Sequence, residues 1–507
     1  MHSRPRHPAA LAPATAAALL LLLLLTITSP AAAVEVNSAS VQLSPAVMLI
    51  GKFDWQVDPA SKPGEPWSRC LDMVWRAAEA GSDRLNFVPT HHWLGNGGSA
   101  SSGIAGYCYM EHTDPADSSS GSTCRPWSEP VITEYRSAMT LCFTEAMRQG
   151  MTLYVRPHLD DGTANGAWRN GLLLQPEAKH SGYSYYDIML APIADALRDS
   201  LAAAAAGGFL RTLPGQKRPH VYFAMQGEMS ATIMRFAGQW AGIIPRLRDR
   251  VGNAHADIKM GVGLNFNRLD DTSSVTKTYD SSRLSWLAWM MGVERGAADA
   301  PPIDANALRS LLSQQLDFVG ISAYAPYTGS GMALSEFENA AFMFGNEMRD
   351  SYGIDVLGLV SSGKLELQYS EFGLGGGGSY GGGQVARSPG EVALRPFFGI
   401  YGPYNPASDP WSIPSNRAFL REFYSKALAW LADPGNKTYK VASVFIWSMA
   451  SWDVLGVYPE STTSSGSYRD PAIAGAIASY NRQVVAAQGG ASVGGGASAG
   501  STPAAGK

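Results

Sequence analysis

The sequence predicts an α/β protein, a (β/α)8 TIM barrel with long βα loops. Three observations lead to this fold class. Short runs rich in β-branched and aromatic residues alternate with longer segments of helical period, which is typical of parallel strands joined by helices. Eight such runs follow one another along the chain. The longest irregular segments come directly after predicted strands, where a barrel carries its functional loops.

The predicted elements follow from these patterns in chain order. The eight strands lie at 47–55, 84–89, 152–157, 221–226, 258–264, 318–322, 365–369 and 442–447. Helical periodicity recurs between them, at 67–80, 132–148, 187–206, 231–250, 337–352 and 417–431. The long loops lie at 91–129, 160–185 and 373–390. Because ordered loops of this length are usually functional, we expect the site at the strand ends that precede them.

Charge and composition narrow the possible partners. Charged residues make up 16% of the 507 residues and the formal net charge is −4, so no basic field favours nucleic acid or an anionic membrane. A neutral substrate fits better. The 13 Trp and 21 Tyr residues offer apolar ring faces on which sugar C–H surfaces stack, although aromatic rings fill protein cores as well.

The N-terminus has the order of a secretory signal peptide. Basic residues come first, an apolar run ends near Leu25, and small residues precede Val34. The sequence therefore predicts a signal peptide at 1–33, a barrel domain at 34–487 and a flexible tail at 488–507, in a secreted, extracellular protein. An uncleaved membrane anchor is the alternative, but the apolar run is shorter than the roughly 20 residues of a span. We expect a monomer without membrane contact after cleavage.

The four cysteines are Cys70, Cys108, Cys124 and Cys142, all in the N-terminal third. In an exported protein they favour disulfides, and three pairings are possible. We favour Cys108 with Cys124, because these two bracket a segment rich in Ser, Gly and Asp that a bond would restrain. The sequence itself leaves the pairing open.

Two glutamates stand at the ends of predicted strands. Glu228 follows the fourth strand and Glu371 follows the seventh, so both are expected at the C-terminal mouth of the barrel. Cleaving a glycosidic bond with retention needs two carboxyl groups about 5 Å apart, one to protonate the leaving oxygen and one to attack the anomeric carbon. A lone glutamate more often caps a helix or forms a salt bridge. Together, the two in this context predict glycoside hydrolysis.

The placement of these glutamates resembles clan A of the retaining glycoside hydrolases, in which the acid/base follows strand four and the nucleophile follows strand seven. Within that clan the chain is most similar to the family 113 β-mannanases. The resemblance covers about 47–458 and rests on five motifs, which are VRPHLD at 155–160, AWR at 167–169, QGE at 226–228, DFVGISAY at 317–324 and SEFG at 370–373.

The resemblance implies roles for four residues. Glu228 would be the general acid/base, and Glu371 would be the nucleophile that forms a covalent glycosyl intermediate. Glu228 is expected to hold its proton because Glu371 is charged nearby. Tyr324, at the end of the sixth strand, would donate a hydrogen bond to Glu371, with a core tyrosine as the alternative. Trp447 would form a platform under the sugar, with simple core packing as the alternative.

Further residues are expected to line the cleft. The strand-three motifs imply sugar contacts for His158, Trp168 and Arg169, with a structural salt bridge or cap as the alternative. Position alone, after the second and fifth strands, adds His91, His92, Trp93 and Asn265.

Gly227 departs from the clan, where an Asn directly before the acid/base hydrogen-bonds the sugar 2-hydroxyl. Family 113 also lacks this Asn, so the departure fits the closer resemblance. The 2-hydroxyl is axial in mannose and equatorial in glucose, and the residue that recognises it is left unassigned.

No metal and no cofactor are expected. His91 with His92, and His158 with Asp160 and Asp161, are ligand-type residues close in sequence, but neither set has a recognised zinc spacing. The glycine run at 375–383 lacks the Lys and Ser/Thr of a phosphate loop. It is expected to form a mobile rim of the cleft.

The sequence thus predicts a secreted retaining β-glycoside hydrolase, endo-β-1,4-mannanase-like by resemblance, that acts by double displacement on a neutral polysaccharide or oligosaccharide. Other β-linked glucans and exo action on mannosides are alternatives within this class. A catalytically inactive glycan-binding or wall-associated protein is the alternative from another class, and the presence of both glutamates argues against it. A barrel hydrolase of esters or amides would need a Gly-x-Ser-x-Gly elbow or paired metal ligands, which the sequence lacks.

Overall fold

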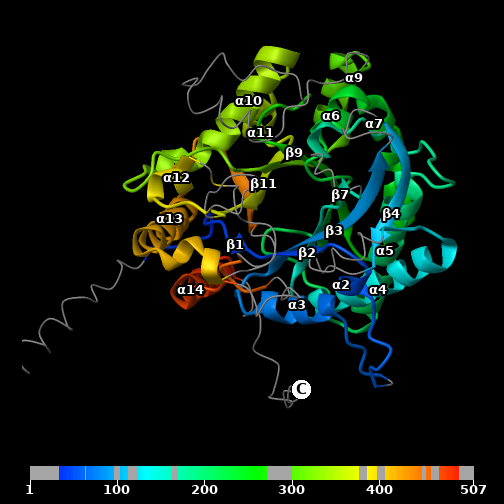
Figure 1. Cartoon of the computed structure of the whole chain (residues 1–507), viewed down its shortest axis with the longest axis horizontal. Helices are drawn as coiled ribbons and strands as arrows, with labels where there is room; N and C mark the ends of the chain where they lie inside the picture. The colour runs from blue at the N-terminus through cyan, green and yellow to red at the C-terminus, as the bar shows by residue number, and fades with distance from the viewer. Residues whose placement is uncertain are drawn as a thin grey trace, which may run out of the picture. The chain divides into compact units, whose positions relative to one another are not determined.

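The computed structural model describes residues 34–62, 64–95, 103–111, 124–162, 169–270, 300–375, 385–394, 396, 406–447, 453–457 and 468–489. The chain separates into two compact units, Met1–Glu35 and Val36–Lys507. The helices and strands below belong to the second unit (Figure 1). The predicted signal peptide at 1–33 and the tail from 490 onward lie outside the described residues.

Within the described residues, eight parallel strands form a barrel. In order around the sheet they are β1 with β2 (Leu43–Ser44 and Ala46–Leu49), β3 (Arg84–Gly95), β6 (Thr152–Val155), β8 (His220–Ala224), β9 (Asp257–Asn265), β10 (Phe318–Ser322), β11 (Glu366–Phe372) and β12 (Val441–Ile446). Each pairs in parallel with the next barrel strand along the chain. The predicted (β/α)8 fold is confirmed by this order.

The first strand closes the sheet, and Pro45 divides it in two. β1 pairs with β12, with Leu43 opposite Val444, whereas β2 pairs with β3, with Ala46 opposite Asn86. Pro45 has no N–H to donate, but its carbonyl accepts the Asn86 N–H at 3.2 Å. One short strand therefore joins both edges of the sheet, and a closed barrel has no open edge.

The first strand differs from its predicted bounds. The prediction placed it at 47–55, but it occupies 43–49, and Lys52–Trp55 forms the short helix α2. The Asp54 carboxylate accepts the Ile50 N–H at 2.8 Å. This local bond to the backbone stabilises a turn in place of further strand pairing.

The second strand continues beyond the barrel into a small outer sheet. An irregular loop was predicted at 91–129, whereas β3 runs to Gly95 and pairs there with β4 (Ile104–Met110) and β7 (His158–Asp161). β5 (Cys124–Pro126) adds to the far side of β4. The predicted loop is therefore partly a sheet, because its backbone groups find ladder partners on β3.

Helices surround the strands (Figure 1). They are α3 (Arg69–Ala78), α4 (Glu129–Arg148), α5 (Ala191–Ala206), α6 (Ser230–Arg235), α7 (Ala237–Val251), α9 (Ala305–Ser310), α10 (Asn339–Tyr352), α11 (Val356–Ser361), α12 (Pro389–Leu394), α13 (Pro414–Ala432) and α14 (Pro471–Ala487). Shorter 3-10 or π turns are η3 (Arg169–Gly171), η4 (Tyr186–Leu190), η6 (Leu311–Gln315), η7 (Leu334–Glu338), η8 (Pro406–Ser408), η9 (Pro410–Ser412) and η10 (Pro434–Asn436). None of the described helices is long and apolar enough to cross a bilayer.

The helix predicted at 231–250 is two helices, α6 and α7. They are separated at Phe236, whose φ of −121° is not helical. Other helix starts follow ordinary capping chemistry. The Ser68 hydroxyl accepts the Leu71 N–H at 3.3 Å before α3, and the Asp470 carboxylate accepts the Ala472 N–H at 2.9 Å before α14.

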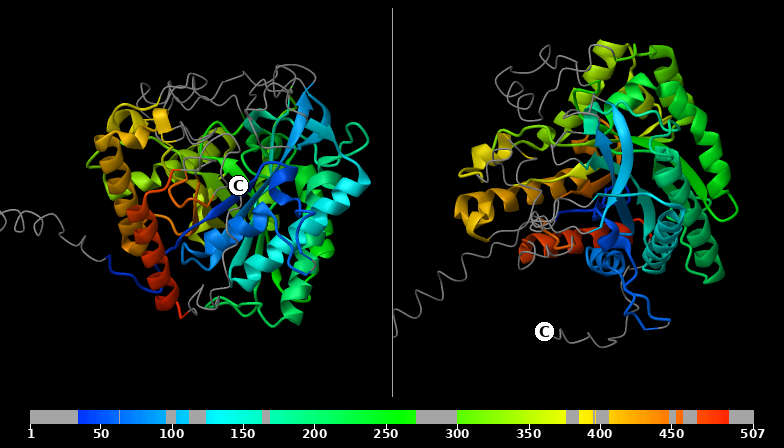
Figure 2. Two further views of the ribbon diagram at one scale, coloured as in Figure 1. Left: turned by 60° about the horizontal axis from the view of Figure 1, so that its bottom comes forward. Right: turned by 45° about the vertical axis from the view of Figure 1, so that its right-hand side comes forward.

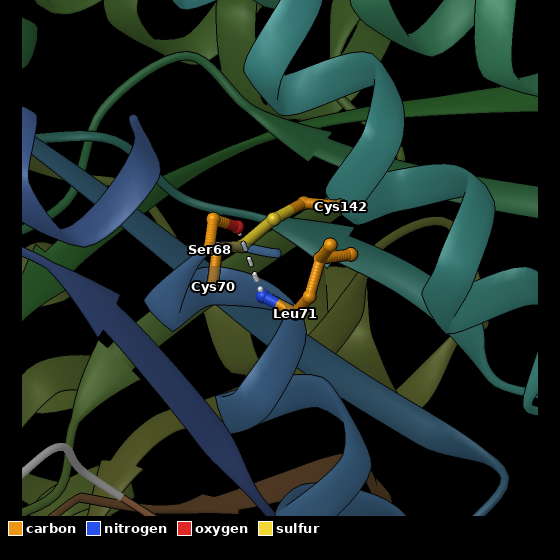
Figure 3. The surroundings of a disulfide bond; sticks show 4 residues. All are labelled: Ser68, Cys70, Leu71 and Cys142. Carbon is orange, nitrogen blue, oxygen red and sulfur yellow. Dashed lines mark hydrogen bonds between the residues drawn. A yellow bond between two sulfur atoms is a disulfide. The ribbon is translucent and has the colours of Figure 1, made fainter. Parts of the chain in front are cut away.

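Two disulfides join neighbouring elements. Cys70 of α3 is bonded to Cys142 of α4, with Cα atoms 6.0 Å apart, and Figure 3 shows this bond beside the Ser68 cap. Cys108 of β4 is bonded to Cys124 of β5. The favoured pairing of Cys108 with Cys124 is therefore confirmed.

Aromatic rings pack together in one part of the barrel core. The buried cluster includes Tyr154, Tyr222, Phe318 and Phe445. The rings of Tyr154 and Tyr222 stack 4.2 Å apart, and the Tyr154 hydroxyl lies 3.0 Å from the Ser443 hydroxyl. Further along the chain from Tyr154, Arg156 and His158 also point into the barrel, as their contacts below show.

The last helix holds the closing strand in place. The Asn481 side chain of α14 accepts the Leu43 N–H at 2.9 Å and donates to the Leu43 carbonyl at 2.8 Å. It also donates to the Ala80 carbonyl at 2.9 Å. In turn, α14 packs against α13, as both views of Figure 2 show in red and orange. The seam of the barrel is therefore bound by a segment far away in sequence.

Candidate active site

An irregular pairing turns Glu371 toward the barrel interior. Ile321 of β10 lies opposite Tyr369, but the next residue, Ser322, lies opposite Glu371, so Ser370 is an extra residue in β11. Tyr369 points outward, where its hydroxyl donates to a backbone carbonyl of η7 at 2.9 Å. A regular strand would place Glu371 on that same outward face. The bulge redirects its side chain.

Glu228 lies in a tight turn after the fourth strand. Its φ of 53° is in the left-handed region, which non-glycine residues seldom adopt. Two hydrogen bonds hold this turn. The Gly227 N–H donates to the Pro157 carbonyl at 2.8 Å, and the Met229 N–H donates to the Gln226 side-chain oxygen at 2.9 Å. Backbone strain of this kind concentrates at functional sites.

Glu371 lies between a tyrosine and a histidine. The Tyr324 hydroxyl donates to Glu371 Oε2 at 3.2 Å, which is the hydrogen bond predicted for it. His158 Nε2 lies 3.4 Å from Glu371 Oε1. All three side chains are buried, so water competes little for these contacts.

Arg169 connects Glu228 to the loop after the third strand. Its Nη2 lies 3.3 Å from Glu228 Oε2, and its Nη1 donates to Asp160. Burial lowers the pKa of Arg169, but the charges of Asp160 and Glu228 outweigh that effect and raise it. The guanidinium is therefore a fixed positive charge, and its salt bridge to Asp160 is the structural alternative that the sequence left open.

A second arginine lies in the barrel interior close to Glu371. Arg156 is 2% exposed, and its Nη2 donates to Gln368 at 3.2 Å. A Cβ at Gly263 or Gly320 would lie 2.8 or 2.7 Å from the Arg156 side chain, so both positions leave room for it. Arg156 was not among the predicted site residues. A sequence signal could have found it. Gly263 and Gly320 lie inside two neighbouring strands, and a glycine within a strand marks a place where another group lies close to the backbone.

Burial and charge set the protonation of Glu371. Burial raises the pKa of Glu371 well above its usual range, and the charge of Glu228 raises it further. Arg169, Arg156 and the Tyr324 hydroxyl lower it by stabilising the anion. The pKa of Tyr324 is raised well above 10 by burial and by the two carboxylates. Tyr324 therefore stays protonated and can donate.

Two other predicted residues lie beside these groups. Trp447 is buried at the end of the eighth strand, and its ring centroid lies 5.5 Å from that of His158. His92 lies opposite Asp160 in the pairing of β3 with β7. Burial lowers the pKa of His92, and the Asp160 charge opposes this. Both rings are therefore near the residues that hold Glu228 and Glu371.

His91 is placed differently from the prediction. It was expected to line the cleft, but its ring packs 4.4 Å from the ring of Trp127 and 4.7 Å from that of Tyr135. Tyr135 belongs to α4, so His91 faces the helix layer. Side chains alternate along a strand, and His92 therefore has the opposite orientation.

The last predicted residues make local contacts or lie outside the described part. The Asn265 side-chain oxygen accepts the Phe266 N–H at 2.9 Å. Trp93 is buried in the outer half of β3. Trp168 and most of the glycine-rich rim, 376–384, lie outside the described residues. Among the residues that are described, no three or more His, Cys, Asp and Glu side chains group together as a metal site.

No family model and no curated relative matches the chain. Solved structures do match. A GH113 β-1,4-mannanase aligns with a TM-score of 0.41 and 11% identity, over 87% of this chain and 99% of the other. A GH113 β-mannanase from Alicyclobacillus acidocaldarius, in complex with ManMIm, aligns with a TM-score of 0.41 and 14% identity, over 88% and 98%.

A GH5_18 protein from Bifidobacterium longum subsp. longum, in complex with Manβ1-4GlcNAc, has a TM-score of 0.39 and 9% identity, over 87% of this chain and 78% of the other. The solved structures named here are of glycoside hydrolases. At these identities and TM-scores the similarity assigns no activity to this chain. Its own side chains carry the argument that follows.

Proposed function

We propose that this chain is a secreted retaining β-glycoside hydrolase that acts on a neutral glycan, with β-1,4-mannan as the expected substrate. One observation supports the proposal most. Two buried carboxyl groups, Glu228 and Glu371, come from the ends of the fourth and seventh strands and interact electrostatically. Burying two carboxyl groups close together opposes folding, and retaining glycosidases use such a pair.

The first chemical step divides the work between the two glutamates. Glu371 attacks the anomeric carbon while Glu228 protonates the glycosidic oxygen, so the glycosidic bond breaks and a glycosyl ester of Glu371 forms. The attack needs the ionised form of Glu371, which Arg169, Arg156 and Tyr324 stabilise. Burial and the charge of Glu228 act in the opposite direction in the empty site. Substrate binding therefore has to favour the anion of Glu371 and the protonated form of Glu228.

The second step releases the sugar. Glu228 removes a proton from water, which attacks the glycosyl ester and regenerates the ionised Glu371 with the original anomeric configuration in the product. Arg169 contacts Glu228 and is anchored by Asp160, so it holds that carboxyl group in place through both steps. Trp447 offers a ring face for the bound sugar.

The sequence supports the proposed substrate class and the proposed location. The strand-end motifs resemble those of the family 113 β-mannanases, and the formal net charge of −4 offers no basic field for an anionic glycan. Long loops after the strands favour a cleft for several sugar units, and hence endo action. The signal-peptide pattern and the two disulfides favour secretion.

The test is release of reducing ends by the purified protein from β-mannan, glucomannan, xylan and mixed-linkage β-glucan. Glu228→Ala and Glu371→Ala are the variants, and Glu65→Ala, on the exposed surface, is the matched control. Release from one polymer that both variants lose and the control keeps would support the proposal. Proton NMR of the first product anomer checks retention. Binding without any release would instead favour an inactive glycan-binding protein.

A further inference from the structure

His158 is a fully buried histidine beside Glu371. Its exposed fraction is 0%, and neither ring nitrogen has a hydrogen-bond partner among the described residues. Glu371 Oε1 also lacks a partner there. The two unpaired groups face each other, since His158 Nε2 and Glu371 Oε1 are 3.4 Å apart. Unpaired buried polar atoms are costly, and active-site hydrogen bonds are often long in the empty enzyme and shorten when it works.

The contact between His158 and Glu371 is not an ion pair. Burial lowers the pKa of His158 well below 6.5, and the charges of Arg169 and Arg156 lower it further. A neutral imidazole has one N–H and one lone pair. Only an N–H on Nε2 can bond to the ionised Oε1. Because Tyr324 already donates to Oε2, such a bond would hold both oxygens of the carboxylate.

Gly227 provides the space for this ring. A Cβ at position 227 would lie 2.4 Å from both Cδ2 and Nε2 of His158, and 2.9 Å from Cγ of Arg156. These distances are too short for any side chain unless the imidazole moves. The ring is enclosed, so moving it would break its contact with Glu371. The glycine that departs from the clan pattern is therefore matched to the histidine that fills the space.

We propose that His158 is a positioning residue that donates its Nε2–H to Glu371 Oε1, and that Gly227 is the space this contact requires. With Tyr324 on the other oxygen, the plane of the carboxylate is fixed for attack. This role differs from the sugar contact predicted from the sequence, because it acts on the carboxylate of Glu371 and not on the ligand. The kinetic consequence rests on the proposed function, whereas the bond itself can be observed without substrate.

The kinetic test uses His158→Ala, His158→Gln and Gly227→Ala on the glycan that the wild type hydrolyses. We expect His158→Ala to lower kcat about ten- to a hundredfold, as for a lost hydrogen bond to a charged group, with little change in KM. The acid limb of kcat/KM should move to higher pH, because the anion of Glu371 has lost a donor. His158→Gln places an amide N–H near the Nε2 position. This variant should therefore recover most of the lost kcat and return the acid limb of kcat/KM most of the way to its wild-type pH.

Gly227→Ala should reproduce the effects of His158→Ala, and the double variant should lose no more than either single variant. His255→Ala and Gly242→Ala are the matched controls, because His255 is exposed and a Cβ at Gly242 meets open space. Additive losses in the double variant would overturn the proposal. The proposal would also be overturned if His158→Ala and His158→Gln lost the same kcat and neither moved the acid limb of kcat/KM, because the ring would then only fill space.

A measurement without substrate separates this inference from the proposed function. At an alkaline pH at which Glu371 is ionised, NMR of protein labelled with 15N-histidine should show the His158 ring, identified by its absence from His158→Gln, as the neutral Nε2–H tautomer. The Nδ1–H tautomer or a charged ring would overturn the inference even in an active enzyme. The Nε2–H tautomer, lost in Gly227→Ala, would support it even in a protein that hydrolyses no glycan, and only the proposed function would then fail.

Discussion

Arg169 Nη2 lies 3.3 Å from Glu228 Oε2, while Asp160 binds Nη1 of the same guanidinium. This contact joins the loop after the third strand to the turn after the fourth. It also acts on the second carboxyl group, because the Arg169 charge lowers the pKa of Glu371. The pH dependence of the reaction should therefore respond to this arginine.

Arg169→Gln should move the acid limb of kcat/KM to higher pH and lower kcat/KM near neutral pH by roughly tenfold or more. Without the cation, the neutral form of Glu371 is favoured, so a higher pH is needed to ionise it. The measurement is kcat/KM as a function of pH. Arg246→Gln, which breaks a surface pair with Glu177, should leave the profile unchanged. An unmoved acid limb in Arg169→Gln would restrict that residue to a structural role.

Tyr324→Phe should lower kcat by about ten- to a hundredfold, because Glu371 Oε2 loses a charge-assisted hydrogen bond. KM should change little, since the phenol acts on the nucleophile. Steady-state kinetics on the glycan give both constants. Tyr480→Phe is the matched control, because it also removes a buried phenol bond, to the Val41 carbonyl at 2.9 Å. If both variants lose activity equally, the effect of Tyr324 is on folding.

Glu371→Gln should abolish hydrolysis and raise the thermal stability near neutral pH. Folding raises the pKa of Glu371, so its contribution to stability is full at low pH and is lost as the pH rises through the raised value. Glutamine has nearly the same size and no charge to bury. Thermal unfolding should show a Tm above that of the wild type, with the difference shrinking on acidification. A Tm difference that grows on acidification would contradict the prediction.

Asp54 should make the stability of the protein depend on pH. Burial raises the pKa of Asp54 from 3.8 to about 6, although the Ile50 N–H and Arg69 oppose it. Its stabilising contribution is full below about pH 3.8 and is lost as the pH rises through about 6. Asp54→Asn should remove this pH dependence, which amounts to about 3 kcal/mol in the free energy of unfolding. Chemical denaturation across that pH range measures the free energy of unfolding of the wild type and of Asp54→Asn. Parallel curves of this free energy against pH would refute the prediction.

The two disulfides should stabilise the protein to different degrees. The bond from Cys70 to Cys142 spans 72 residues and the bond from Cys108 to Cys124 spans 16. Chain entropy predicts losses of about 4 and about 3 kcal/mol when each pair is replaced by serine. Thermal unfolding of the two double-serine variants checks the order. The differences should disappear when every protein is measured under reducing conditions.

The fold could be predicted because its signals repeat locally. The strand predicted at 318–322 coincides with β10, and the one at 152–157 contains β6. The errors fall where a single polar contact or ladder partner overrides the pattern. Asp54 ends the first strand early by accepting the Ile50 N–H. In the second strand, β4 and β7 supply partners that extend the strand beyond its predicted end.

The candidate site could be predicted only in part. The positions of Glu228 and Glu371 follow from strand order, because the C-terminal ends of parallel barrel strands share one face. The direction of Glu371 does not, since strand alternation would place it with the outward Tyr369 and only the bulge in β11 turns it inward. Arg156 was missed because its role depends on space left by glycines on other strands.

The sequence by itself determined the eight-unit barrel and the two strand-end glutamates, because each is encoded by residue types within one segment or by the order of segments. Tertiary structure alone decided that Pro45 would divide the strand closing the sheet, which cysteines would pair, that His158 would lie beside Glu371, and that Arg169 would reach Glu228. These relationships join atoms from separate strands and loops. They depend on bulges, on the volume missing at a glycine and on burial, which exist only once the barrel has closed.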